Sequence, residues 1–173
     1  MLLLLAAATI PAPAPEEPRP LAPAENEWDA RSGALVEAGI GAMMRQPFYG
    51  GASTSSIAVL RAGMHEYGLE WTVGGALGTT FADRDDTPWE AIATVGGRVQ
   101  RPSRAFYLLR GTAGVFSIAA DQGFALGAEG GGGLALGRVV RFESVLLVRA
   151  ATGIEGKGLT PLIGGYVAVV VIP

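Results

Sequence analysis

The residues of this chain that could best carry out chemistry are five glutamates and five arginines, which lie on separate short segments. Carboxylates and guanidinium groups enclosed together can transfer protons, bind ions or neutralise one another in pairs. Which of these three roles applies depends on how the segments that carry the ten residues are arranged. The ten residues are Glu37, Arg61, Glu70, Glu90, Arg98, Arg110, Glu129, Arg141, Glu143 and Arg149.

The remaining reactive residue types give no catalytic pattern. Cysteine is absent, which excludes a thiolate nucleophile, a cysteine metal site and disulfides. The single histidine, His65, lies beside Glu66 in an expected tight turn of residues 65–68, and no serine follows it before Ser103. A serine nucleophile needs an adjacent base. We therefore interpret His65 as a solvated turn residue and expect no enzyme activity.

Two other motifs have a structural interpretation. Asp83, Asp85 and Asp86 lack the turn glycine and distal glutamate of a calcium loop, so we expect a charged external loop. No helix is expected after the glycines of 127–133, and residues 156–158 lack the Ser or Thr that completes a phosphate-binding loop. We expect no metal and no cofactor, and we expect the glycines to make room for long charged side chains.

Length and composition limit the architecture. The 173 residues suffice for one domain, or for about eight strand-and-turn units of roughly 17 residues each. The net charge is −3 and the basic residues are scattered, which argues against a nucleic-acid partner. No run of 18 apolar residues occurs, so a helical membrane span is not expected.

The first 33 residues differ from the rest of the chain. Residues 1–10 resemble the apolar core of a secretory signal, and cleavage after Ala8 or after Ala24 fits the small-residue rule. Residues 11–33 hold six of the eleven prolines together with five acidic residues, a composition that cannot bury a core. We expect a leader over 1–24, a linker over 25–33 and a folded domain over 34–173, with the proline-rich segment disordered.

Short runs of alternating polarity fill the folded domain. In residues 69–81, one face carries Leu69, Trp71 and Val73, whereas the other carries Glu70 and Thr72. This period of two residues predicts β-strands. The expected strands cover residues 35–44, 54–64, 69–81, 89–100, 105–117, 124–137, 141–150 and 162–172. The last run is apolar on both faces, as a buried strand of a water-soluble protein can also be.

The alternation places charged residues and large apolar residues on opposite faces of the strands. The runs at 35–44, 54–64 and 105–117 alternate less regularly, and they can be phased so that Glu37, Arg61 and Arg110 join the polar face. With this phasing, all ten charged residues share one face of their strands, and the opposite face of the expected strands carries no charge. A soluble sandwich or lipocalin-like barrel predicts the reverse, because its charges point to water. A transmembrane barrel allows charge only inside, since a charge at the bilayer midplane costs about 2–4 kcal/mol. The sequence thus predicts an all-β, antiparallel, up-and-down transmembrane β-barrel with a lumen plugged by Glu and Arg.

The connections predict how such a barrel is oriented. Links near 65–68, 101–104 and 137–139 are short, those near 45–53, 82–88 and 151–160 are longer, and the link near 119–122 is a short exception. Periplasmic turns of membrane barrels are short and external loops are long, so both termini should face the periplasm. Aromatic residues then form two belts, with Trp71, Tyr107 and Phe142 near the periplasm and Phe81, Trp89 and Phe124 near the outside. The alternative is that these aromatic residues cover a soluble core.

Several stretches carry a resemblance to a known family. They are residues 106–116 (FYLLRGTAGVF), 127–137 (GAEGGGGLALG), Phe142-Glu143 and 161–165 (PLIGG). In strand pattern the chain resembles the bacterial outer-membrane β-barrel domain proteins over roughly residues 34–172. This resemblance implies a small barrel, similar to the transmembrane part of outer membrane protein A, in a Gram-negative outer membrane. Some such barrels are lipid A deacylases with serine two residues after histidine, but Tyr67 stands there in this chain.

Three functions remain open on this basis. The first is an outer-membrane protein with a structural or interaction role, whose partners are outer-membrane lipid or lipopolysaccharide and a protein met through the external loops. The second is a narrow, porin-like channel. The third is a soluble periplasmic β-barrel that binds an apolar ligand. The pattern indicates neither the oligomeric state nor the identity of a ligand.

Overall fold

Eight strands of 12 to 16 residues make up the folded part of the protein. The structure, a computed structural model, describes residues 32–45, 53–80, 89–101, 104–118, 121–153 and 158–173. The described residues include no helix long and apolar enough to cross a membrane. The strands are β1 (Gly33–Arg45), β2 (Ser53–Glu66), β3 (Leu69–Thr80), β4 (Trp89–Gln100), β5 (Ala105–Ile118), β6 (Asp121–Leu136), β7 (Val140–Thr152) and β8 (Leu159–Val171).

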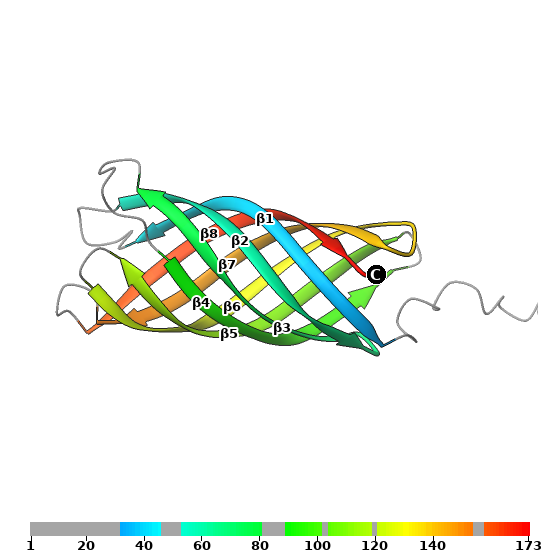
Figure 1. The fold of residues 1–173 in the computed structure, drawn as a ribbon, viewed down its shortest axis with the longest axis horizontal. Helices are drawn as coiled ribbons and strands as arrows, with labels where there is room; N and C mark the ends of the chain where they lie inside the picture. Colours follow the sequence, from blue (N-terminus) through cyan, green and yellow to red (C-terminus); the bar gives the residue numbers. More distant parts are fainter. Residues whose placement is uncertain (1–31, 46–52, 81–88, 102–103, 119–120, 154–157) are drawn as a thin grey trace, which may run out of the picture.

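The strands close into a single antiparallel barrel. Each strand pairs with the next along the chain, and β8 pairs with β1 from Val36↔Val171 to Arg45↔Leu162. Figure 1 shows the strands crossing the long axis of the molecule obliquely, as closure of a barrel requires. The start of β1, the end of β8 and the three short turns share one end, which we call the short-turn end. The predicted all-β, up-and-down barrel of eight strands is confirmed.

Local residue chemistry explains the tightest turn. Tyr67 and Gly68, between the paired residues Glu66 and Leu69, both have positive φ angles, of 48° and 80°. Two positive φ angles in a two-residue loop match the twist of the strands that the loop connects. The turn is therefore two residues long rather than the expected four, because His65 and Glu66 belong to β2.

Two expected strand starts were too late, and several predictions fall outside the described residues. β6 begins at Asp121 and β8 at Leu159, three residues earlier than expected in each case. The predictions that lie outside the described residues concern the leader, linker residues 25–31, loop residues 46–52, 82–88 and 154–157 with Asp83, Asp85 and Asp86, and the belt residue Phe81.

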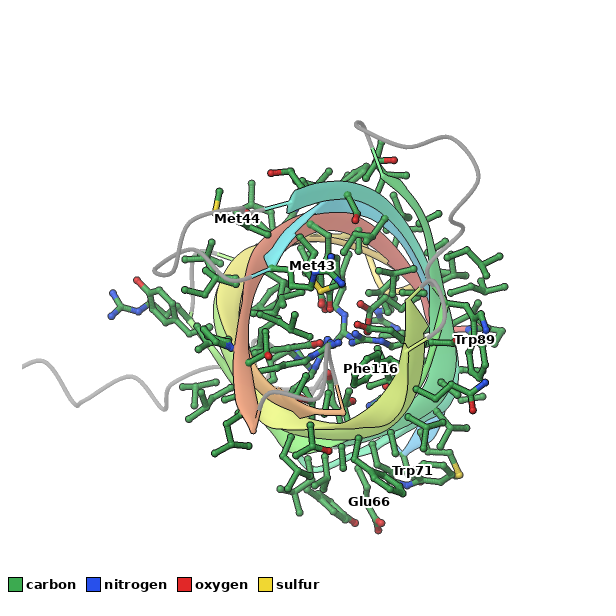
Figure 2. All side chains as sticks on the ribbon, turned by 90° about the vertical axis from the view of Figure 1, so that its left-hand side faces the viewer. Met43, Met44, Glu66, Trp71, Trp89 and Phe116 are labelled. Carbon is green, nitrogen blue, oxygen red and sulfur yellow. The ribbon has the colours of Figure 1, made fainter. Side chains whose placement is uncertain are left out.

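Exposure alternates along the strands with the period of the pleat. In β7, for example, every second residue from Arg141 to Ala151 is buried, and the residues between them are exposed. Viewed from the end opposite the short turns, Met43 and Phe116 point into the barrel and Trp71 and Trp89 point away from it (Figure 2). Glu66, the last residue of β2, is exposed on the outer side, and it is a charge that the sequence analysis had assigned to a turn.

Inward-facing glycines make space for the buried arginines. Gly74, Gly96 and Gly127 lie directly across from Arg61, Arg110 and Arg149 on the neighbouring strands. A Cβ atom placed on Gly96 would lie 2.5 Å from Arg110 Cα, closer than atoms can approach. Glycine is thus required at this position because an arginine passes over it.

We expect Gly96→Ala to destabilise the barrel and the adjacent Gly97→Ala to leave it nearly unchanged. The Gly96 methyl group would push β4 away from β5, at a penalty of about 1–3 kcal/mol typical of overpacking. A Cβ on Gly97 would face outward, 3.8 Å from its nearest neighbour, the carbonyl oxygen of Gly68. Urea unfolding in detergent micelles measures both variants. Equal losses of stability would contradict the packing explanation.

Candidate functional site

All ten of the charged residues singled out from the sequence have their side chains inside the barrel. Each is buried, and the most exposed of them, Glu90, retains 7% of its accessible surface. They come from seven strands, and β8 contributes none of them. In order along the chain they are Glu37, Arg61, Glu70, Glu90, Arg98, Arg110, Glu129, Arg141, Glu143 and Arg149.

These side chains form one continuous chain of contacts in which the sign of the charge alternates. The formal charges of five glutamates and five arginines cancel. From the short-turn end, the contacts are Arg98–Glu70 (3.2 Å), Glu70–Arg141 (2.5 Å), Arg141–Glu143 (3.5 Å), Glu143–Arg110 (2.9 Å), Arg110–Glu37 (3.1 Å), Glu37–Arg61 (3.7 Å), Arg61–Glu129 (2.7 Å), Glu129–Arg149 (2.8 Å) and Arg149–Glu90 (2.5 Å). We call this set the lumen charge chain.

Two ion pairs join opposite walls of the barrel. Glu129 on β6 accepts two hydrogen bonds from Arg61 on β2, at 2.8 and 2.7 Å. Arg110 on β5 donates to Glu37 on β1 at 3.1 Å. In a ring of eight strands, these partners are four strands apart, so their side chains meet in the middle of the lumen. The interior of an eight-stranded barrel is just wide enough to be filled in this way.

Tyr166 on β8 belongs to this network and was missed by the sequence analysis. Its hydroxyl group accepts a hydrogen bond from Arg61 at 3.0 Å and donates one to Glu129 at 3.0 Å. The Arg61 guanidinium group also lies 5.4 Å from the centre of the Tyr166 ring. Because both faces of β8 are apolar, the alternation of polarity did not indicate which residues of this strand point into the lumen. The signal was available, because Tyr166 is the one residue of that strand with both an aromatic ring and a hydroxyl group.

Uncharged side chains fill the barrel on both sides of the charge chain. Toward the short-turn end, Phe106 is 1% exposed and its ring lies 5.6 Å from the guanidinium groups of both Arg98 and Arg141. Toward the other end, Met43 and Phe116 are 5% and 2% exposed, and both point into the lumen (Figure 2). Buried uncharged side chains therefore lie in the lumen on both sides of the lumen charge chain.

His65 lies inside the barrel, which corrects its interpretation as a solvated turn residue. It is the next-to-last residue of β2, is 4% exposed, and lies opposite Gly33 on β1 and Glu70 on β3. A Cβ placed on Gly33 would be 3.2 Å from His65 Nε2, so the ring covers this glycine. The two-residue turn causes the difference, since it leaves His65 in the strand and on the inward parity.

The described aromatic residues of the two predicted belts all face outward. Trp71, Tyr107 and Phe142 lie near the short-turn end and are 49%, 55% and 48% exposed. Trp89 and Phe124 lie near the opposite end and are 42% and 67% exposed. Their position at the interfaces of a bilayer stays a prediction.

The chemistry available to this arrangement is charge neutralisation. Each carboxylate in the lumen is within 4 Å of at least one guanidinium group, and the guanidinium groups of arginine stay protonated in proteins. Among the described residues, no three His, Cys, Asp or Glu side chains gather as metal ligands would. The ion pairs and hydrogen bonds of the network join side chains from opposite walls of the barrel.

Comparison with known proteins gives a likeness in structure. No protein-family model and no curated protein sequence matches the chain. Among solved structures, the crystal structure of Neisserial surface protein A matches with a TM-score of 0.72 and 12% sequence identity, over 82% of this chain and 98% of that chain. This likeness confirms the resemblance to small outer-membrane barrels at the level of the fold. The protein is a closed, eight-stranded antiparallel β-barrel with the fold of Neisserial surface protein A.

Proposed function

We propose that the protein is an outer-membrane barrel with a structural or interaction role, and that the lumen charge chain acts as a plug. The observation that carries this proposal is the inversion of polarity: ten buried charges inside and large apolar side chains outside. Ile40, Leu60, Leu109 and Leu126 each expose between 63% and 68% of their surface. In water this arrangement would be unfavourable on both faces, whereas in a bilayer it is favourable on both.

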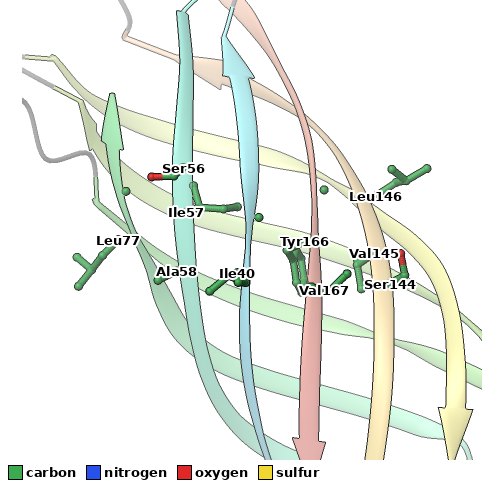
Figure 3. Close-up of a pocket in the computed structure, with 13 residues that line it drawn as sticks. Ile40, Ser56, Ile57, Ala58, Leu77, Ser144, Val145, Leu146, Tyr166 and Val167 are labelled. Carbon is green, nitrogen blue, oxygen red and sulfur yellow. The ribbon is translucent and has the colours of Figure 1, made fainter. Parts of the chain in front are cut away.

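The outer wall remains apolar even where it is hollowed. A shallow depression crosses β7, β8, β1 and β2 near the middle of the barrel, among Ile40, Leu146 and Val167 (Figure 3). Ser56 and Ser144 place hydroxyl groups at its edge, and no charged side chain is among the described residues that line it. Hydrocarbon chains of lipid fit such a surface. Water would solvate this apolar surface unfavourably.

The packed lumen favours a plug over the narrow channel. A conducting path needs polar surface in contact with water, but Arg61, Arg110, Arg141 and Glu129 are at most 1% exposed. The same charges disfavour the soluble barrel, because an apolar ligand would meet ionised groups in the middle of the lumen. A structural or interaction role then falls to the outer wall and to the ends of the barrel.

Cell fractionation and gel mobility test the membrane assignment. We expect the protein in the outer-membrane fraction, extracted only by detergent, and migrating faster before boiling than after boiling, because a folded barrel binds less dodecyl sulfate. Recovery in the soluble periplasmic fraction without detergent would overturn the proposal and leave the soluble barrel.

Conductance in planar bilayers separates the plug from the channel. We expect the inserted protein to give no single-channel steps, because the lumen charge chain leaves no continuous water path. The control is a porin preparation that conducts in the same bilayer. Steps from the wild type that vanish or change in size with Arg98→Ala would show that these residues conduct ions, and would replace the plug with the channel.

A further inference from the structure

We propose that Arg101 and Arg104, together with Tyr107, form a binding site for the phosphate of an anionic phospholipid at the short-turn end of the barrel. This inference rests on the proposed membrane location. It adds a specific ligand class and a specific place on the outer wall.

The direction of Arg101 is the first evidence. Its guanidinium group lies over the Tyr107 ring, 4.9 Å from the ring centre. Tyr107 faces outward and is 55% exposed, so the arginine turns along the outer wall rather than into the lumen. A cation held at this place next to an exposed aromatic ring lies where lipid headgroups meet the apolar wall.

Arg104 adds a second exposed cation on a backbone that is held in place. It precedes β5, is exposed, and has a φ angle of 65°, which is rare for a residue with a side chain. Three backbone hydrogen bonds hold this conformation: Arg101 N to Ala105 O at 2.7 Å, Arg104 N to Arg101 O at 3.2 Å, and Ala135 N to Arg104 O at 3.0 Å. Two arginines are thus displayed within four residues on a turn that is tied to β6.

The surrounding charge has the sign that a phosphate needs. The neighbouring turn between β6 and β7 carries Arg138, and Glu66 is the exposed acidic side chain at this end among the described residues. The ten lumen charges cancel one another, so they leave no net negative charge behind the turn. Guanidinium groups bind phosphate oxygens through two parallel hydrogen bonds, which is stronger than the point attraction of an ammonium group.

A phospholipid suits the site better than a soluble anion because the site is half apolar. Arg101 supplies the charge, whereas Tyr107 and the outward-facing Leu109, which is 67% exposed, continue down the same strand. A headgroup bound to the arginines therefore has an apolar wall for its acyl chains directly beneath it. A free anion would use only the upper half of this surface.

Native mass spectrometry of the intact barrel in non-ionic detergent tests the proposal. The protein is supplied with equal amounts of phosphatidylglycerol and phosphatidylcholine, and the ratio of retained lipids is measured. We expect the wild type to prefer phosphatidylglycerol, and we expect Arg101→Gln and Arg104→Gln each to lower this preference about fivefold, the effect of one cation near an anionic surface.

A matched variant removes two positive charges from the other end of the barrel. Arg45 ends β1 there, and Lys157 lies in the connection between β7 and β8. The Arg45→Gln/Lys157→Gln variant should retain the wild-type preference. An equal loss in this variant, or displacement of the lipid by millimolar inorganic phosphate, would overturn the proposal in favour of general charge attraction or a free-anion surface.

The proposed function fails in a different way from this inference. If the wild type does not insert into phosphatidylcholine vesicles and shows no heat-modifiable mobility, the membrane assignment is wrong. If it inserts and folds but retains both lipids equally, the membrane assignment stands and the phospholipid site is wrong. Heat-modifiable mobility of each variant shows that the barrel is folded when its lipids are counted.

Discussion

Leu146→Arg is expected to destabilise the barrel strongly in a membrane. Leu146 lies at the middle of the 13-residue strand β7 and is 72% exposed on the outer wall. An arginine there would face the centre of the hydrocarbon layer, where a cation on a barrel costs about 2–4 kcal/mol. Its neighbours across the strands are Gly130 and Gly165, which offer no side chain to pair with it. The measurement is the free energy of unfolding after refolding into phospholipid vesicles.

Leu159→Arg is the matched control for this experiment. Leu159 is also a leucine with 72% exposure, but it is the first residue of β8 and lies at an end of the barrel. A cation near the interface costs about 0–1 kcal/mol, so this variant should fold and insert. A soluble barrel would tolerate both arginines equally, since surface substitutions usually change stability by about 0.5 kcal/mol or less. Equal behaviour of the two variants would therefore contradict the membrane assignment.

Glu129→Ala is expected to have the largest effect inside the lumen. Glu129 is fully buried and accepts hydrogen bonds from Arg61, Arg149 and Tyr166. Removing its carboxylate leaves two buried guanidinium groups short of negative charge, and breaking a buried pair in this way typically costs about 3–5 kcal/mol. Urea unfolding of the refolded protein measures the loss. Glu129→Gln should lose less, because the amide still accepts hydrogen bonds although it carries no charge.

Glu66→Ala provides the comparison with an exposed carboxylate. Glu66 ends β2 on the outer side of the barrel, outside the lumen charge chain. We expect it to change the unfolding free energy by about 0.5 kcal/mol or less. If Glu129→Ala and Glu66→Ala were equally mild, the lumen would be open enough for water to replace the missing carboxylate, and the plug would be wrong.

These two experiments address the two faces of the same wall. Leu146→Arg adds a charge where the proposal forbids one, and Glu129→Ala removes a charge where the proposal requires one. The two residues lie one pairing position apart on adjacent strands, and their side chains point to opposite faces. Together they test whether the barrel has charged side chains inside and a lipid-facing apolar wall, the reverse of a soluble protein.

Much of the fold was predictable because strand alternation is a local property. A period of two residues assigns each side chain to a face without knowledge of its partners, and this was enough to put Glu70 and Arg149 on the polar faces of two strands that are far apart in the chain. It was also enough to place the tight turn at Tyr67-Gly68 to within two residues. The exact strand limits were less accurate, because pairing with neighbours extends β6 and β8 beyond their alternating runs.

The partners within the lumen could not be predicted from the alternation. Arg61 meets Glu129, which is 68 residues away, only because β2 and β6 face each other across the closed barrel. Its contact with Tyr166, 105 residues away, depends on the same closure. The turn length has a similar influence on His65, since two residues more in the turn would have left it outside the strand.

The amino-acid sequence by itself determined which side chains share a face and that one face is charged and the other apolar, because these follow from covalent order and the pleat of a strand. Only the tertiary structure decided which charges meet across the lumen, that Tyr166 bonds to them, and that His65 lies inside the barrel. The physical reason is that closure and stagger of eight strands set distances across the lumen, and no local pattern carries that information.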